Sequence, residues 1–134
     1  MDGDLRVPIT GDADIVTARQ EGRRLASQLS FSSGDLTVIA AAISEIARNI
    51  LLYASRGEVV LRLVGDKAGR RGISILAADD GPGIPDLSLA MQDGFSTSGG
   101  LGLGLPGARR LMDEFEITST AGRGTVITMR KWTR

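Results

Sequence analysis

The sequence predicts an α+β fold, a two-layer sandwich in which a mixed or antiparallel sheet carries helices on one face. The chain has 134 residues, 42% of them apolar, which suits one globular domain over residues 1–134. Strand-like segments come in two pairs, each joined by a short turn that contains glycine. The expected order of elements is β-α-α-β-β-(α)-α-β-β. Paired hairpins with helices packed on one face give an α+β sandwich and not a doubly wound parallel sheet.

The first half of the chain predicts one short strand and two helices. Residues 5–9 alternate weakly, and Pro8 suits an edge strand or a strand end. A helix is expected from Asp12 or Asp14 to about Leu29, with apolar side chains on one face. Residues 35–54 contain no glycine or proline and are apolar almost all round. They predict a long central helix that is covered on several sides.

The second half predicts two hairpins with helical segments between them. Strands are expected at residues 58–64, 72–78, 115–120 and 125–132. A short, marginal helix is expected at 86–93, after Pro85. A further helix is expected from Pro106 to about Phe115, because proline is tolerated in the first turn of a helix.

Two missing residue types exclude several kinds of site. The chain has no cysteine, which excludes disulfides, thiolate nucleophiles and cysteine-ligated zinc. It has no histidine, which excludes a Ser-His-Asp hydrolase, a histidine-ligated metal and a kinase that phosphorylates its own histidine. Any general base must therefore be a carboxylate, lysine or tyrosine, and any metal should be hard and oxygen-ligated.

Charge and the N-terminal segment bear on the partners and the location. With 16 basic and 16 acidic residues the formal net charge is zero, so neither nucleic acid nor an anionic membrane is expected as the main partner. The acidic start of the chain lacks the design of a signal peptide. We also expect no apolar run close to the roughly 20 residues of a membrane span. These features predict a cytoplasmic protein.

Glu45 and Asn49 lie one turn apart on the expected central helix, so they share one face. An acid and an amide at this spacing could orient a metal and a nucleophile together. The other interpretation is a helix whose two polar side chains simply face solvent. The spacing alone does not decide between the two.

Two glycine-rich segments follow. Asp79, with Gly81 and Gly83, ends an expected strand and could accept a hydrogen bond from an exocyclic amine, although an Asx-turn gives the same pattern. In residues 100–104 every second residue is glycine, and a helix is expected to follow. The backbone N–H groups of this segment and the N-terminus of that helix could bind phosphate. This segment is neither a Walker A motif nor a Rossmann fingerprint, because no Gly-Lys-Ser/Thr follows it and no buried strand precedes it.

The order and spacing of the motifs are more specific than any one of them. The four motifs are Glu45-x-x-x-Asn49, Asp79-Asp-Gly-Pro-Gly83, Gly100-Leu-Gly-Leu-Gly104 and Gly122-Arg-Gly-Thr125. Together they resemble the Bergerat-type ATP-binding fold of gyrase-type ATPases, Hsp90 chaperones, histidine kinases and MutL. Within that superfamily the chain is similar, over nearly its full length, to the small serine/threonine kinases of bacterial partner-switching systems.

This resemblance implies ATP and Mg²⁺ as cofactors. Asn49 would ligate the Mg²⁺ that bridges the phosphates, and Glu45 would be the general base that takes the proton of an acceptor hydroxyl. The chain departs from the sporulation anti-sigma kinase of this branch, whose lid contains basic residues, since residues 81–108 contain no lysine or arginine. The lid is also short, so weak or rapidly exchanging nucleotide is expected.

The remaining nucleotide contacts are also implied by the resemblance. Asp79 would hold the adenine amino group, Gly81 and Gly83 would back the base, and Thr125 would support it from the neighbouring strand. The other implied contacts are Ile84 and, in the lid, Ser98, Gly99, Gly100, Leu101, Gly102, Leu103, Gly104 and Leu105.

The resemblance further implies a reaction and partners. The chain would phosphorylate STAS-domain proteins of a stressosome and, on release, bind and activate a PP2C-type phosphatase. The alternative is a non-enzymatic anti-sigma factor that uses nucleotide only as a switch. Arg19, Arg23 and Arg24 of the first helix form either a solvated face or a partner-docking surface, and a homodimer is left open.

Overall fold

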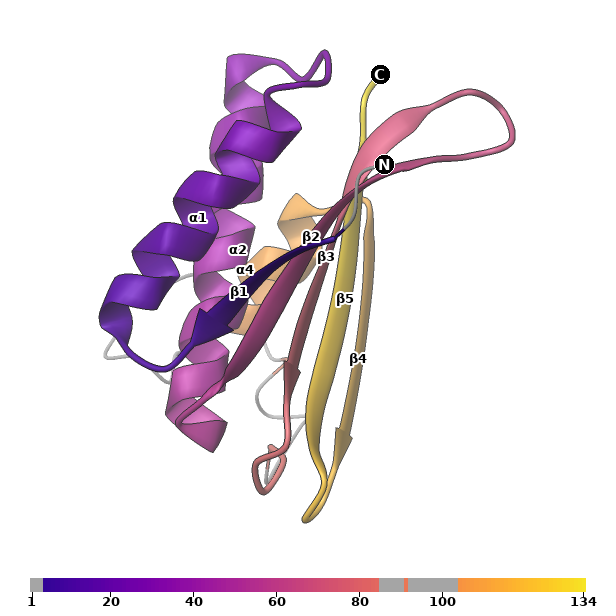
Figure 1. Cartoon of the computed structure of the whole chain (residues 1–134). Coiled ribbons are helices and arrows are strands. Elements are labelled where there is room, and N and C mark those ends of the chain that lie inside the picture. Colours follow the sequence, from indigo (N-terminus) through magenta and orange to yellow (C-terminus); the bar gives the residue numbers. More distant parts are fainter. Residues whose placement is uncertain (1–3, 85–90, 92–103) are drawn as a thin grey trace.

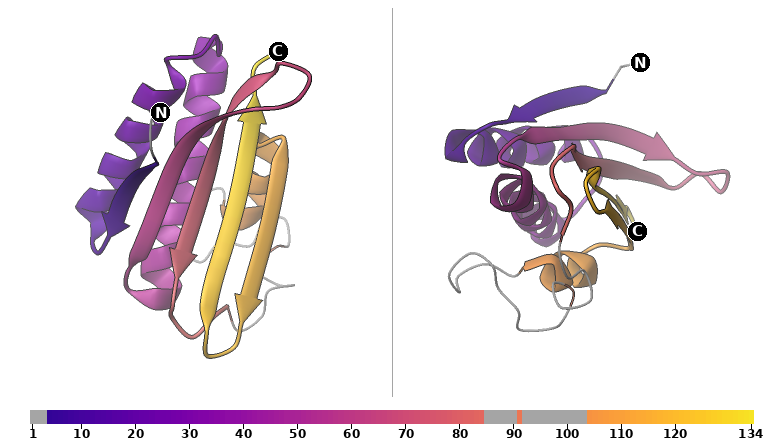
Figure 2. Two further views of the ribbon diagram at one scale, coloured as in Figure 1. Left: turned by 45° about the vertical axis from the view of Figure 1, so that its right-hand side comes forward. Right: turned by 90° about the horizontal axis from the view of Figure 1, so that it is seen from below.

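The computed structural model describes residues 4–84, 91 and 104–134. The strands are β1 (Leu5–Ile9), β2 (Gly57–Gly65), β3 (Arg71–Asp79), β4 (Glu114–Thr120) and β5 (Gly124–Trp132). The helices are α1 (Asp12–Ala26), α2 (Ser33–Ala54) and α4 (Gly104–Leu111). The strands form one antiparallel sheet in the order β1-β2-β3-β5-β4. Figures 1 and 2 show the helices on one face of this sheet, which confirms the predicted α+β class.

Helix α2 is the central helix that the sequence predicts. The Ser32 hydroxyl caps it by accepting a hydrogen bond from the backbone N–H of Asp35 at 3.0 Å, and Ser55 ends it with a φ of 70°. Its face toward the sheet and α1 is buried, with Ile43 and Ile46 fully inaccessible to solvent. By length and composition α2 could cross a membrane, which corrects the expectation that no apolar run is long enough. Its packing is that of the core helix of a globular domain.

Helix α1 begins as predicted but ends earlier. Of the two acids that the sequence offered, Asp14 stabilises the start of the helix. Its carboxylate accepts hydrogen bonds from the backbone N–H groups of Thr10 and Gly11. These bonds and the Thr10 hydroxyl lower the pKa of Asp14. The predicted end near Leu29 is wrong: α1 ends at Ala26, where backbone bonding changes to tight i to i−3 turns.

Helix α4 also differs from the prediction, which placed it from Pro106 to about Phe115. It runs from Gly104 to Leu111, and Phe115 lies in β4. The buried ammonium of Lys131 donates a hydrogen bond to the carbonyl of Leu111 at 3.1 Å, at the negative end of the helix. The helix therefore ends where the chain has to join the sheet.

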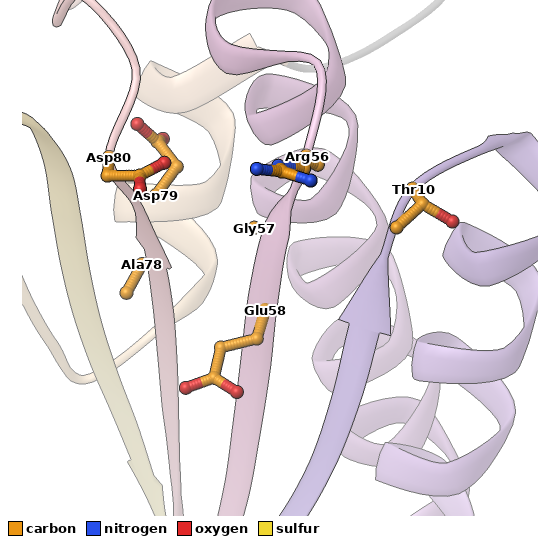
Figure 3. A pocket seen from close by; sticks show the side chains of 7 residues that line it. All are labelled: Thr10, Arg56, Gly57, Glu58, Ala78, Asp79 and Asp80. Carbon is orange, nitrogen blue, oxygen red and sulfur yellow. The ribbon is translucent and has the colours of Figure 1, made fainter.

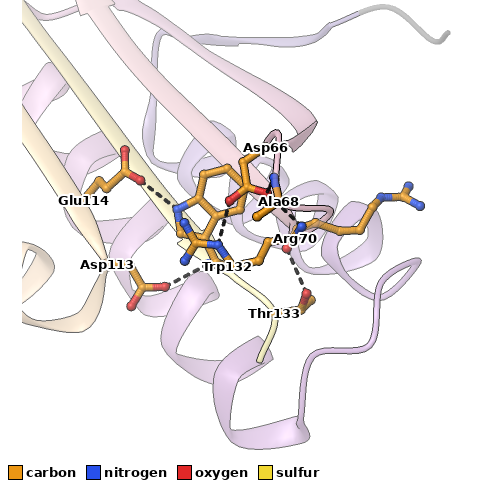
Figure 4. A network of polar contacts seen from close by, with 8 residues as sticks. Asp66, Ala68, Arg70, Asp113, Glu114, Trp132 and Thr133 are labelled. Atoms are coloured by element: carbon orange, nitrogen blue, oxygen red, sulfur yellow. Dashed lines mark hydrogen bonds and ion pairs between the residues drawn. The ribbon is translucent and has the colours of Figure 1, made fainter.

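A polar network closes the far end of the sheet (Figure 4). The Trp132 indole N–H donates to Glu114 at 2.7 Å, and the Trp132 backbone N–H donates to Asp113 at 2.8 Å. The guanidinium of Arg70, in the β2–β3 hairpin, lies 4.7 Å from the centre of the Trp132 ring. This network joins the β2–β3 hairpin to the start of β4 and the end of β5. The candidate site lies at the other end of the sheet, where β3 ends and β5 begins.

Candidate functional site

Glu45 and Asn49 lie on a largely buried face of α2. Asn49 is 6% exposed, and the side chain of Glu45 is 10% exposed. The interpretation in which both side chains face solvent is therefore wrong. One Glu45 carboxylate oxygen (Oε2) accepts a hydrogen bond from Arg48 Nη1 at 2.9 Å, and the other (Oε1) accepts one from the backbone N–H of Gly104 at 3.1 Å. Glu45 thus connects the central helix with the first residue of α4.

Asn49 offers a suitable ligand for a magnesium ion that is bound together with nucleotide. No hydrogen bond joins its side chain to another residue in the part of the chain that the structure describes. The same residues contain no cluster of three or more acidic side chains that would hold a metal alone. Mg²⁺ is commonly held by one or two protein oxygens and by substrate phosphates. A single amide oxygen fits that arrangement.

Asp79, Thr125 and Ser119 lie side by side on three adjacent strands. Thr125 of β5 is paired with Asp79 of β3 on one side and with Ser119 of β4 on the other. One Asp79 carboxylate oxygen (Oδ1) accepts hydrogen bonds from the backbone N–H groups of Gly81 at 3.0 Å and Thr125 at 3.2 Å. The bond from Gly81 is an Asx-turn, so that interpretation of the motif is correct. It uses one carboxylate oxygen, Oδ1, which also accepts the bond from Thr125.

Ser119 is the residue of this cluster that the sequence did not indicate. Its hydroxyl oxygen accepts a hydrogen bond from the backbone N–H of Ile84 at 2.7 Å and lies 3.0 Å from the Thr125 hydroxyl. The backbone N–H of Gly122 also donates to the carbonyl of Pro82 at 3.0 Å. These contacts fasten the loop after β3 to the β4–β5 hairpin. Only the strand register could have indicated Ser119.

The glycines of the Asp79 motif are required by the packing of the protein itself. A side-chain carbon on Gly81 would lie 2.5 Å from the Ala54 side chain, at the end of α2. Gly83 has a φ of 86°, and a side-chain carbon there would lie 2.9 Å from the carbonyl oxygen of Thr120. Their role in backing an adenine ring stays a prediction.

The lid is only partly described. Its residues Ser98 to Leu103, with Gly99, Gly100, Leu101 and Gly102 between them, lie outside the described residues, as does the expected helix at 86–93 apart from Met91. Gly104 and Leu105 begin α4, and Leu105 is 5% exposed and packs in the core. Nucleotide contacts at all these positions stay predictions.

A hollow of about 460 Å³ lies where β2 begins and β3 ends (Figure 3). Glu58 and Ala78, which line it, are cross-strand partners on the open face of the sheet. Alternation along β3 puts the Asp79 side chain on the other face, with buried Ala77. Asp79 nevertheless also lines the hollow, together with Asp80, so the hollow reaches the start of the Asp79 motif.

Comparisons with known proteins identify the family. Residues 10–131 match the model of the histidine kinase-like ATPase domain. The chain is also 55% identical over 128 residues to the serine/threonine-protein kinase RsbT of Bacillus subtilis (strain 168), with 96% of both proteins covered. The chain belongs to the RsbT-like branch of the histidine kinase-like ATPase family. The family resemblance that the motifs predicted is thereby confirmed.

Two further comparisons extend this result. The chain is 30% identical over 118 residues to an anti-sigma F factor of Thermoanaerobacter sp. (strain X514), covering 86% of this chain and 82% of that protein. The fold is similar to the RsbU and RsbW domains of a Mycobacterium tuberculosis protein, with a TM-score of 0.64 and 20% identity. That match covers 99% of this chain and 33% of the other, and it shows the fold alone.

Proposed function

We propose that the chain is a protein serine/threonine kinase that transfers the γ-phosphate of ATP to a hydroxyl of a small protein partner. The pairing of Glu45 with Asn49 on one largely buried face of α2 carries this proposal. It puts a carboxylate, which can accept a proton, one helical turn from an amide oxygen, which can ligate a metal. The name of the RsbT relative supports serine or threonine as the acceptor.

Each residue has a defined part in the proposed reaction. Asp79 would accept a hydrogen bond from the adenine amino group, with Thr125 beside it. Asn49 would ligate Mg²⁺, which would neutralise charge on the phosphates when bound. Glu45 would take the proton of the acceptor hydroxyl while the oxygen of that hydroxyl attacks the γ-phosphorus. The bond to the β-phosphate then breaks and ADP leaves.

The proposed partners follow from the family. Substrates would be STAS-domain proteins of a stressosome-like complex, and the released kinase would bind and activate a PP2C-type phosphatase. Three arginines of α1 are a candidate docking surface for one of them: Arg23 and Arg24, which are exposed, and Arg19, which is partly buried. We propose a cytoplasmic location, and neither nucleic acid nor a membrane is part of the proposed function.

The proposal is tested by incubating the chain with labelled ATP, Mg²⁺ and a purified STAS-domain protein. We expect label on a serine or threonine of the partner. A partner whose serine and threonine hydroxyls are removed serves as the control. Label that appears only as free phosphate, at the same rate with and without the partner, would contradict a protein kinase.

The alternative is an anti-sigma factor that sequesters its target, and the similarity to an anti-sigma F factor favours it. The two functions are separated by capture of purified partners with the immobilised chain, with ATP or ADP present. A kinase of the proposed kind retains the STAS protein and the phosphatase. Retention of a sigma factor alone, without labelling of any partner, would favour the anti-sigma function.

A further inference from the structure

We propose that Arg48 is a positioning residue, which orients the carboxylate of Glu45 for proton abstraction. This inference rests on the proposed kinase function and extends it, since the family motif assigns no role to position 48. Arg48 Nη1 donates to Glu45 Oε2 at 2.9 Å, while the backbone N–H of Gly104 donates to Oε1 at 3.1 Å. Each oxygen of the general base is therefore held by a donor from a different element.

Two donors on opposite oxygens fix the part of a glutamate that is otherwise loosely defined. The last side-chain torsion of glutamate is broad, so the carboxylate plane normally rotates with little restraint. Arg48, one turn along α2, and Gly104, at the start of α4, set that plane together. A carboxylate has about four lone-pair sites, so these two donors do not by themselves prevent it from accepting a proton.

The ion pair of Glu45 and Arg48 is more buried than a typical surface ion pair, so its electrostatic attraction is stronger. The Glu45 side chain is 10% exposed and that of Arg48 is 37% exposed, so solvent screens the pair only in part. α1 contains a matched pair: Arg24 and Glu21 have the same i, i+3 spacing and the same 2.9 Å separation. Their side chains are 55% and 32% exposed. Substitution of Arg24 therefore controls for the loss of one helical ion pair in a measurement made without a protein partner.

A second role for Arg48 has to be separated from positioning. Residues 81–108 contain no lysine or arginine, so Arg48 could instead move to the phosphates and neutralise their charge. In that case its loss would weaken ATP binding and would act independently of Glu45. A positioning residue acts through Glu45 alone, so its effect disappears when Glu45 is no longer a base.

The kinetic test measures phosphate transfer to a STAS-domain protein against ATP concentration. We expect Arg48→Met to lower kcat about tenfold, with KM for ATP changed less than about twofold, and Arg48→Lys to recover part of the loss. In a Glu45→Gln background Arg48→Met should cause no further loss. Arg62→Met, which removes the ion pair with Asp4 and lies outside the candidate site and the docking surface, should match wild type. A rise in KM, or losses from Arg48→Met and Glu45→Gln that multiply, would overturn the proposal.

A second measurement does not depend on kinase activity. In the nucleotide-free protein, the exchange rate of the Gly104 amide proton, followed by NMR, reports its bond to Glu45. We expect Arg48→Met, but not Arg24→Met, to raise that rate several-fold. An unchanged rate would overturn the positioning role. If the wild-type chain transfers no phosphate, the proposed function fails, and this measurement still decides whether Arg48 holds Glu45.

Discussion

The carboxylate of Glu45 accepts a hydrogen bond from the backbone N–H of Gly104, 59 residues further along the chain, at 3.1 Å. The contact joins the middle of the central helix to the N-terminus of α4, where the helix dipole favours a negative group. The acid that the sequence indicated as a base therefore also contacts the first residue of α4. The proposed catalytic role of Glu45 and its contact with α4 thus involve the same side chain.

Asp79→Asn should weaken ATP binding by about tenfold or more, the effect of losing a hydrogen bond to a charged group. The amide oxygen can still accept from the N–H groups of Gly81 and Thr125, but the amide nitrogen would then meet the adenine amino group, donor against donor. Isothermal calorimetry measures the change. Asp80→Asn, at the exposed neighbouring position, should bind like wild type. Equal affinity in both variants would remove Asp79 from the adenine site.

Ser119→Ala should destabilise the protein by about 1–3 kcal/mol, because the backbone N–H of Ile84 loses its acceptor. It should also weaken ATP binding, because the loop after Asp79 is no longer tied to β4. Urea unfolding and calorimetry measure the two effects. Thr118→Ala, on the exposed face of the same strand, is the matched control. If both substitutions have equal effects, Ser119 does not support the site.

Gly124→Ala should cost more stability than Gly122→Ala, although both glycines have positive φ in one hairpin, 109° and 77°. A side-chain carbon on Gly122 has no neighbour within 4 Å, so only the left-handed backbone is penalised, by about 1–2 kcal/mol. On Gly124 it would collide with the carbonyl of Asp79 and would also displace that residue. Urea unfolding followed by fluorescence of the single tryptophan, Trp132, measures both. Equal losses of unfolding free energy in the two variants would mean that close packing of Gly124 against Asp79 does not contribute to stability.

Glu114→Gln should reduce the loss of stability in acid. The hydrogen bond from Trp132, with that from Arg130, holds the pKa of Glu114 below its usual value. A carboxyl with a lowered folded-state pKa stabilises the fold above its unfolded-state pKa, and this contribution is lost as the pH falls through the folded-state pKa. The stability difference between wild type and variant should therefore shrink between about pH 5 and about pH 3. The effect should be small, because the side chain is 45% exposed.

Urea unfolding at several pH values measures this difference. If Glu114→Gln shows the same pH dependence as wild type, the hydrogen bond from Trp132 does not contribute to acid stability.

Local sequence pattern predicted most of the fold, because alternation and helical periodicity arise within each element. It failed at the end of α1, where local backbone turns replace the helix, and at the ends of α4, where tertiary contacts are made. Lys131 caps the end of α4 from a strand 20 residues further on, and Gly104 begins that helix opposite Glu45. No local signal in residues 104–115 carries either contact.

The site divides in the same way. The spacing of Glu45 and Asn49 placed both on one face of a helix, but their burial depends on the elements packed around α2. Ser119 lies in a strand of alternating serine and threonine and resembles its exposed neighbours in sequence. Its role depends on the register that puts it opposite Thr125. The pairing of β4 with β5, and not the local sequence, therefore identifies Ser119 as part of the site.

The proposed role of Glu45 is tested most directly by transfer of labelled phosphate from ATP to a STAS-domain protein by wild type and by Glu45→Gln. Glutamine keeps the shape of the side chain but cannot accept the proton. We expect the transfer rate to fall about 10²–10⁴-fold, the usual contribution of a general base, while the dissociation constant for ATP stays unchanged. Transfer by Glu45→Gln at the wild-type rate would contradict this role.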